Sequence, residues 1–418
     1  MVTAISAIFV FFIIVLVHEG GHFAVAKLSG VKVHEFAIGM GPKLLKFTKG
    51  ETDYTLRALP IGGYVRMEGE DEESDDERSI NNIPVFARIA VFAAGAIMNF
   101  LLALLIFIGI AISSGAPTNE ILITDEKSPA YEAGIRSGDI LESINGENIN
   151  IWDEYSFITT EKQYNVLNVV VNRNDKKLKF NVKPELIDKK MIGISPKSTD
   201  SKPTTIIESV QKDMPADKAG IQSGDKFIKI NNKEIRNWDD IVNVINNSEG
   251  KDINVVVLRD GERLSYNVET VIRKQQNIGL NPKVSNSLFD AIKYGFNKII
   301  FFIILMFDFL GQLFSGKVKS DQVAGPVGVI SLVGQAAEVG FLNVLYMAAF
   351  LSVNLGFLNL LPIPALDGSR IMFGLIELVR GKPIDPDKEG FIHFIGFVLL
   401  LTLMVFVTYK DIARLDLF

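Results

Sequence analysis

The 418-residue sequence contains no cysteine and only four histidines. The lack of cysteine excludes disulfide bonds and thiolate metal ligands, so any bound metal ion has to be held by His, Asp or Glu side chains. Apolar residues, by contrast, are abundant, and 48% of the chain is hydrophobic. A soluble enzyme normally carries a smaller share, so the composition favours a membrane protein.

Four apolar stretches can cross a bilayer, which takes about 20 helical residues. They cover residues 2–26, 89–112, 341–362 and 391–408. The first is long enough only if it includes its polar residues. No Lys or Arg precedes it, whereas a secretory signal peptide begins with a positive region, so we expect a retained span. A fifth stretch, 297–314, carries Asp308 near its middle.

The charged residues indicate which loops are cytoplasmic. Basic residues cluster around the first loop and before the last span, at Lys27, Lys32, Lys43, Lys46, Arg88, Arg370, Arg380, Lys382 and Lys388. The positive-inside rule assigns both loops to the cytoplasm, and therefore both chain ends and segment 113–286 to the outside. Eight carboxylates between Glu68 and Glu77 predict a solvated loop.

Segment 113–286 contains an internal repeat with an offset of 86 residues. Ser128-Pro129-Ala130, Ala133-Gly134-Ile135 and Ser137-Gly138-Asp139 recur as Met214-Pro215-Ala216, Ala219-Gly220-Ile221 and Ser223-Gly224-Asp225. Each copy predicts a short helix that begins at a proline, a Ser-Gly-Asp turn and alternating strands. The pattern resembles the PDZ domain of bacterial proteases, which holds peptide ends by adding a strand to a sheet edge. The alternative is that either copy is only a spacer.

The first span contains His18-Glu19-Gly20-Gly21-His22, which fits H-E-x-x-H. On a helix, positions four apart share a face, so both imidazoles can reach one metal ion with Glu19 beside them. A carboxylate in the middle of a spanning helix costs about 2.5–3.5 kcal/mol and usually marks function. The alternative is a set of helix–helix hydrogen bonds around buried histidines.

A catalytic zinc site keeps three protein ligands and one open position, so two histidines need one more partner. Asp367 stands just after the third apolar stretch, behind Pro362 and Pro364, which stop and redirect the helix. It is the natural third ligand. It could also be the N-cap of a helix that begins near Ser369, and the two roles are compatible. His34 and His393 are not expected to be ligands.

At these motifs the chain resembles the site-2 protease family of intramembrane zinc metalloproteases, in particular its bacterial regulator-of-sigma-E protease branch with tandem PDZ domains. In that family H-E-x-x-H lies on the first membrane helix and N-x-x-P-x-P-x-L-D-G on the third. Here these motifs are His18–His22 and Asn359–Gly368, and every defining position matches. Ser369 departs from a second glycine that is usual in the branch.

The resemblance implies metal-assisted hydrolysis with one zinc ion per chain and Glu19 as the base. Asn359 resembles a family residue that contacts the substrate or the developing oxyanion, and Asn354, Pro362 and Pro364 are weaker candidates for substrate binding. For Asn354, an interhelical hydrogen bond is the alternative. Segment 59–67, with Gly62, Gly63 and Tyr64, resembles the family's membrane-reentrant β loop, whose edge could pair with an unwound substrate. An ordinary cytoplasmic hairpin is the alternative.

Metal ligation also bears on the fifth apolar stretch. The first span enters from outside and carries His22 in its cytoplasmic half. Asp367 reaches the same depth only if the third span also runs inward. Because the chain starts from an external PDZ pair, we expect 297–314 to lie along the outer face, or to dip into it, without crossing.

The expected fold is thus a polytopic α-helical membrane protein with four transmembrane helices, a cytoplasmic-side reentrant β loop and two extracytoplasmic α+β PDZ domains. The expected segments are a first membrane helix (1–28), the loop with the β segment (29–87), a second membrane helix (88–114), two PDZ domains (115–199 and 200–286), an amphipathic or membrane-surface helical segment (287–340), a third membrane helix leading to L-D-G (341–366), a cytoplasmic loop (367–390), a fourth membrane helix (391–409) and a tail (410–418).

The leading hypothesis for function is an intramembrane protease of the plasma membrane. The family implies single-span substrates already shortened outside, such as anti-sigma factors or signal-peptide remnants, with peptide ends at the PDZ domains and no nucleic-acid partner. One rival is a PDZ-based membrane scaffold with a structural metal. A zinc transporter fits less well, because a catalytic glutamate beside one metal site serves hydrolysis better than release.

Overall fold

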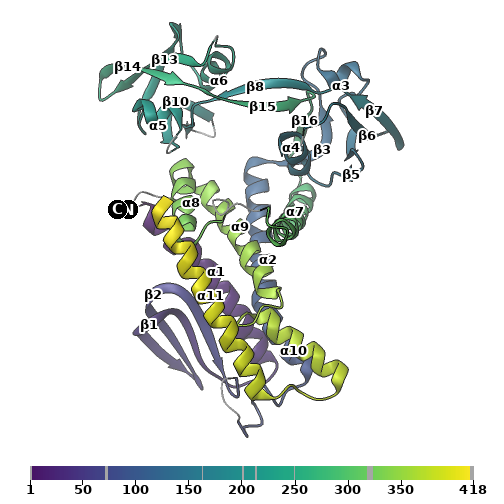
Figure 1. The fold of residues 1–418 in the computed structure, drawn as a ribbon, viewed down its shortest axis with the longest axis vertical. Helices are drawn as coiled ribbons and strands as arrows, with labels where there is room; N and C mark the ends of the chain where they lie inside the picture. Colours follow the sequence, from purple (N-terminus) through teal and green to yellow (C-terminus); the bar gives the residue numbers. More distant parts are fainter. Residues whose placement is uncertain are drawn as a thin grey trace. The chain divides into compact units, whose positions relative to one another are not determined.

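The computed structural model describes residues 2–70, 74–161, 163–199, 202–211, 214–248, 250–317 and 323–414. The chain forms two compact units. The first consists of Met1–Ser113, Gly295–Ala337 and Phe341–Phe418, and the second of Ser114–Tyr294 and Glu338–Gly340. Helices dominate the first unit and strands dominate the second (Figure 1). Residues 71–73 of the acidic run lie outside the described residues.

The helices of the first unit are α1 (Val2–Leu28), α2 (Val85–Ser114), α7 (Leu288–Phe314, which begins in the second unit), α8 (Pro326–Val339), α9 (Phe341–Leu360), α10 (Asp367–Arg380) and α11 (Pro386–Arg414). Lipid offers no hydrogen-bond partners, so a long apolar sequence has to satisfy its backbone as a helix. Among the described residues, five helices are long and apolar enough to cross a membrane: α1, α2, α7, α9 and α11. The helix beyond the four predicted spans is α7, which includes stretch 297–314.

Small residues let α1, α2 and α9 approach closely, as in membrane helix packing. A Cβ atom on Gly21 of α1 would lie 2.5 Å from the carbonyl oxygen of Ala94 in α2. One on Gly356 of α9 would lie 3.0 Å from the carbonyl oxygen of Ala96. The backbone of α2 is therefore enclosed between the helix that carries H-E-x-x-H and the helix that leads to Asp367.

Strands β1 (Val33–Lys49) and β2 (Thr52–Met67) form a small antiparallel sheet. Each strand bends, so that Phe36–Ile38 pairs both with Gly63–Val65 and with Tyr54–Leu56, while Leu45–Lys49 pairs with Thr52–Leu56. The two strands thus act as four short ones. Among the described strands, the segment around Gly63 is hydrogen-bonded on one side only, and it packs beside α1.

The second unit contains two lobes of the same design. The first lobe has β3 (Ala116–Leu122), α3 (Pro129–Glu132), β4 (Ile140–Ile144), β5 (Glu147–Asn148), α4 (Trp152–Glu161), β6 (Leu167–Arg173), β7 (Lys176–Val182) and β16 (Asn281–Ser285). The second has β9 (Ile194–Thr199), β10 (Lys202–Val210), α5 (Pro215–Ala219), β11 (Lys226–Ile230), β12 (Lys233–Glu234), α6 (Trp238–Asn246), β13 (Asp252–Arg259) and β14 (Glu262–Glu269). The sheet orders, β16-β3-β4-β6-β7 and β9-β10-β11-β13-β14, are equivalent under the repeat.

The two lobes exchange their last strands, which corrects the contiguous division into 115–199 and 200–286. Strand β9, from the end of the first copy, pairs with β10, and β16, from the end of the second copy, pairs with β3. Ile192 packs in the core of the second lobe, and Ile278 in that of the first. Strands β8 (Glu185–Met191) and β15 (Val271–Asn277), which are equivalent in the repeat, pair antiparallel between the lobes. Because the repeat makes the exchanged segments alike, either lobe could accept either one, and the sequence pattern does not reveal the exchange.

Candidate metal centre

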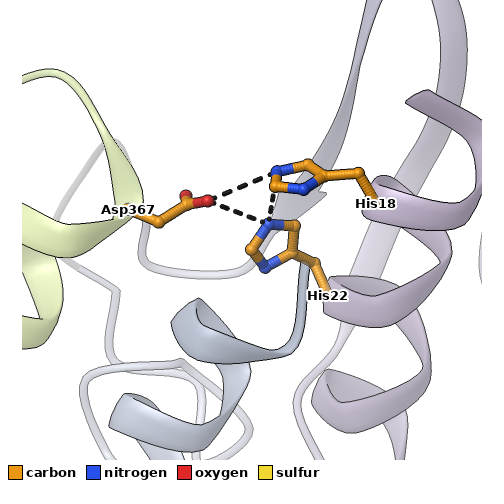
Figure 2. A group of neighbouring side chains, drawn as sticks. All are labelled: His18, His22 and Asp367. Atoms are coloured by element: carbon orange, nitrogen blue, oxygen red, sulfur yellow. Dashed lines mark hydrogen bonds and ion pairs between the residues drawn. The ribbon is translucent and has the colours of Figure 1, made fainter. Parts of the chain in front are cut away.

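His18 and His22 lie one turn apart on α1, and both are buried. Asp367 is the first residue of α10, beyond the turn that follows α9. The helix N-cap is Leu366, without a side-chain cap bond, so Asp367 is not the N-cap. Figure 2 shows the carboxylate of Asp367 aimed at both imidazoles. Residues from distant parts of the sequence therefore meet at one point.

The three facing atoms form a regular triangle. His18 Nε2 and His22 Nε2 are 3.3 Å apart, and each lies 3.3 Å from Asp367 Oδ2. In a tetrahedral zinc site with bonds of about 2.0–2.1 Å, neighbouring ligand atoms are about 3.3–3.4 Å apart. The triangle thus matches one face of such a tetrahedron, which leaves the fourth corner for water or substrate.

The charge state of this cluster also fits a cation. Asp367 Oδ2 is buried and has no hydrogen-bond partner. A buried carboxylate oxygen without a donor is costly, and a bound divalent ion would offset that cost. Within the described residues, His18, His22 and Asp367 are the only group of three or more His, Asp or Glu side chains close enough together to hold one ion. The donor set, two imidazoles and one carboxylate, suits zinc.

Helix α2 supports both histidines, which sequence reasoning missed. His22 Nδ1 donates to the carbonyl oxygen of Val91 at 2.8 Å, and the amide of Asn99 lies 3.2 Å from His18 Nδ1. A Cβ atom on Gly95 would lie 2.3 Å from His22 Nε2, so only glycine leaves room for the ring. The sequence did contain a signal for the role of α2, because Asn99 is the one polar side chain in the apolar stretch 89–112.

The remaining candidates from the third motif are dispersed. The amide nitrogen of Asn359 lies 3.1 Å from His18 Nε2, at the metal cluster. Asn354 donates to the carbonyl oxygen of Phe350 in its own helix. Pro362 is exposed, and Pro364 packs against Gly396 of α11. Among these four residues, Asn359 alone has a side chain within hydrogen-bond distance of His18 or His22.

The two remaining histidines have other partners. His34 bonds Glu68 at 2.7 Å, and His393 of α11 accepts a hydrogen bond from the backbone N–H of Ala365 at 3.1 Å. Ala365 has a φ of 75°, an unusual conformation for a residue with a side chain. His393 therefore holds the strained turn that carries Asp367, although it is not part of the three-residue cluster.

The small sheet reaches the centre at Gly63. A Cβ atom there would lie 2.9 Å from Glu19 Cγ and from Val15 Cγ1, so the strand backbone passes directly beside Glu19. Gly62, with a φ of 72°, packs near Met40. The side chain of Tyr64, which follows Gly63, accepts a hydrogen bond from Arg57.

A buried carboxylate braces this part of the sheet. Arg57 also donates to Glu35 at 2.8 Å, and Glu35 is only 3% exposed. Burial acts to raise the pKa of Glu35, but hydrogen bonds from Thr55, Arg57 and Lys43 outweigh it and lower this pKa to about 2. Glu35 is therefore ionised at neutral pH and fixes Arg57, which in turn fixes Tyr64.

Comparison with known families shows which family the chain belongs to. The model of peptidase family M50 matches residues 6–403. The chain belongs to peptidase family M50, the site-2 protease family. The M50 match includes both sequence motifs and all three residues of the cluster. The predictions of the family and of a zinc-dependent metalloprotease are confirmed.

Curated M50 relatives match over nearly their full length. Zinc metalloprotease RasP of Shouchella clausii is 33% identical over 99% of this chain and 100% of the relative. Zinc metalloprotease RasP of Bacillus licheniformis is 34% identical over 100% of both chains. Regulator of sigma-W protease RasP of Bacillus subtilis is 32% identical over 99% of both chains.

Among solved structures, parts of this M50 chain are similar to PDZ-containing proteins. The HtrA3 PDZ domain bound to a phage-derived ligand is 18% identical, with a TM-score of 0.19, and the match covers 22% of this chain and 92% of that one. The HtrA-type protease AlgW with a decapeptide is 15% identical, with a TM-score of 0.20, over 27% of this chain and 42% of that one.

Proposed function

We propose that this M50 protein is an intramembrane endopeptidase in which His18, His22 and Asp367 hold one zinc ion and Glu19 is the general base. The observation that carries the proposal is the triangle of ligand atoms with 3.3 Å sides, one corner of which is a buried carboxylate oxygen without a donor. An oxygen left in this state is difficult to explain as a structural feature alone.

Zinc in such a site acts as a Lewis acid toward water and toward an amide carbonyl. Glu19 lies on the same helix between the two histidines, where its carboxylate can accept the proton of the attacking water. It then returns that proton to the amine that leaves. Asn359 contributes an amide donor at the edge of the cluster, where it can stabilise the charge that develops on the carbonyl oxygen.

The edge of the small sheet supplies a way to hold the substrate. A transmembrane helix hides its amides in its own hydrogen bonds, so cleavage requires an extended segment with new partners. Among the described strands, the segment around Gly63 has an unpaired edge, and the missing side chain lets this segment pack directly against α1 beside Glu19. We infer that substrates bind here as an added strand, with Gly62, Gly63 and Tyr64 as contacts.

The substrate class follows from this arrangement and from the family. One extended segment within the membrane suits single-span proteins already shortened outside, such as anti-sigma factors or signal-peptide remnants. A relative with near-full coverage carries the name regulator of sigma-W protease, which fits a role in regulated intramembrane proteolysis.

We propose that the two lobes are PDZ domains that screen out bulky ectodomains or hold peptide ends. The second lobe has a groove of about 300 Å³ between the Ile192–Ile194 loop and α6. Its lining is largely apolar and includes Met214, Ile241 and Ile245. An apolar chain end added along β9 would fit this groove.

We propose that four helices span the plasma membrane: α1, α2, α9 and α11. Asp411, near the end of α11, accepts hydrogen bonds from the backbone N–H groups of Gly325 and Gly328, and Gly334 of α8 packs on Thr3 of α1. Figure 1 likewise shows the start of α1 and the end of α11 together beside α8. Too few residues separate Phe314 from α8 for another spanning helix. Helix α7 therefore lies along this side of the membrane or dips into it, without crossing.

The decisive experiment replaces Glu19 with Gln in the full-length protein and supplies single-span peptides. Proteolysis should fall by about 10²- to 10⁴-fold, since the base is lost, while zinc content stays at one per chain. Glu126→Gln, on an exposed turn of the first lobe, is the matched control and should cleave normally. Chelation should stop cleavage by the unmodified protein. If the unmodified protein bound one zinc ion per chain but cleaved no peptide, the result would instead support a PDZ-based membrane scaffold with a structural metal.

A further inference from the structure

Asn99 of α2 is fully buried, and among the described residues its side-chain amide is the only hydrogen-bond partner of His18 Nδ1. The amide nitrogen lies 3.2 Å from that ring atom. The carbonyl oxygen of the same amide, Oδ1, is buried and has no hydrogen-bond partner. A fully buried asparagine with an unused acceptor, in hydrogen-bond contact with one of the two histidines of the proposed metal site, calls for a chemical explanation.

His22 shows what the cluster requires of an imidazole. Its Nδ1 faces the backbone carbonyl oxygen of Val91, which can only accept a hydrogen bond. The proton of neutral His22 is therefore on Nδ1, and the lone pair on Nε2 faces Asp367 and the site of the ion. In metal centres this outer contact sets the tautomer and the orientation of the ring.

The same reasoning applies to His18, whose Nε2 also faces Asp367. If Nε2 is to bind a cation, Nδ1 has to carry the proton and needs an acceptor. An amide N–H₂ group opposite an N–H group would set donor against donor. The nitrogen and oxygen of an amide have nearly the same shape, so hydrogen-bond chemistry decides which of them faces the ring.

We infer that Asn99 turns its oxygen to His18 and accepts the Nδ1 proton, and that it thereby acts as a positioning residue for the metal centre. This inference rests on the proposed zinc site. The backbone carbonyl oxygen of Asn99 also accepts a hydrogen bond from the hydroxyl of Ser352 in α9 at 2.8 Å. Helix α2 thus orients both imidazoles, His22 through a backbone carbonyl and His18 through a side-chain carbonyl.

Two substitutions separate this role from simple packing. Asn99→Asp has nearly the same shape, and its ionised carboxylate can accept a hydrogen bond from Nδ1 but cannot donate one. Asn99→Leu has a similar size and cannot accept at all. Zinc affinity is measured on the purified full-length protein in lipid nanodiscs by competition with a chromophoric chelator. The Leu variant should bind zinc about 10- to 100-fold more weakly, and the Asp variant should bind within about threefold of the unmodified protein or more tightly.

Ser352→Ala is the matched control, since it removes a buried hydrogen bond to the backbone of Asn99 without altering the contact with the ring. Its zinc affinity should stay within about twofold. Cobalt loading gives a second readout: the visible absorption spectrum of the Asp variant should match that of the unmodified protein, and the spectrum of the Leu variant should differ. Equal loss of affinity in the Asp and Leu variants would overturn the inference, as would full affinity in the Leu variant.

The inference and the proposed function fail in different ways. If the unmodified protein bound no zinc, or if Glu19→Gln cleaved normally, the proposed function would fail. If zinc bound at one per chain and Glu19→Gln was inactive, but the Asn99 variants did not separate as described, only the role of Asn99 would fail.

Discussion

Carboxylates with buried oxygen atoms occur in both units of the molecule, and their hydrogen-bond partners differ from site to site. In the second lobe, fully buried Asp225 accepts hydrogen bonds from Arg259 at 2.6 and 2.8 Å and from the backbone of Gln222 at 2.9 Å. Asp139 in the first lobe has the equivalent arrangement with Arg173. In the helical unit, the buried Oδ2 atom of Asp367 faces two imidazole nitrogens, each 3.3 Å away.

The difference separates a structural carboxylate from a functional one. A buried charge is tolerated when its own chain surrounds it with donors, because the pair then offsets the loss of hydration. Asp225 and Asp139 meet that condition and hold their lobes together. Asp367 does not, which fits its proposed role as a metal ligand. The incomplete hydrogen bonding of the buried Asp367 oxygen is therefore the observation on which the proposed metal site rests.

The largest expected effect comes from Gly95, where the helical unit leaves room for the histidine rings. Gly95→Ala adds a Cβ atom 2.3 Å from His22 Nε2 and 2.7 Å from His18 Cε1, so the rings have to move. Zinc affinity should fall by on the order of 100-fold or more, and proteolysis with it. Gly109→Ala on the same helix meets no atom within 4 Å and should bind zinc normally. Equal zinc binding by both variants would show that α2 does not constrain the site.

The second prediction compares the two kinds of carboxylate directly. Asp225→Asn leaves Arg259 without its buried partner and should lower the stability of the second lobe by about 3 kcal/mol. Asp367→Asn should not destabilise the metal-free helical unit, because no Arg or Lys side chain among the described residues pairs with this carboxylate. Amide hydrogen exchange, read at Val255 and Val257 of β13 and along α9, measures both effects. A large loss of protection in metal-free Asp367→Asn would mean that this carboxylate is structural after all.

The third prediction concerns the side of the membrane and should leave activity unchanged. Because the chain has no cysteine, a single one can be labelled without background. Lys317→Cys, after α7, should react with a membrane-impermeant maleimide on intact cells, as should Glu126→Cys in the first lobe. Lys382→Cys, between α10 and α11, should react only after lysis. If Lys317→Cys behaved like Lys382→Cys, α7 would cross the membrane and the four-span topology would be wrong.

Sequence reasoning reached the residues of the metal cluster because their chemistry is local. H-E-x-x-H on a helix brings two imidazoles to one face whatever surrounds them, and a carboxylate behind two prolines is a recognisable turn. The contacts of α2 with the histidines could not be found in this way. Gly95 and Asn99 act through distances of a few ångströms to another helix, and their spacing alone fits ordinary helix packing equally well.

What the sequence by itself determined was the set of apolar helices, the motif residues and the duplicated lobe, because hydrophobic runs, helical periodicity and repetition are written along the chain. Tertiary structure alone decided three other features. It brought His18, His22 and Asp367 into a triangle, it set the strand at Gly63 against Glu19, and it exchanged β9 and β16 between the lobes. Each depends on which surfaces pack together, and packing is settled by the shapes of residues far apart in sequence.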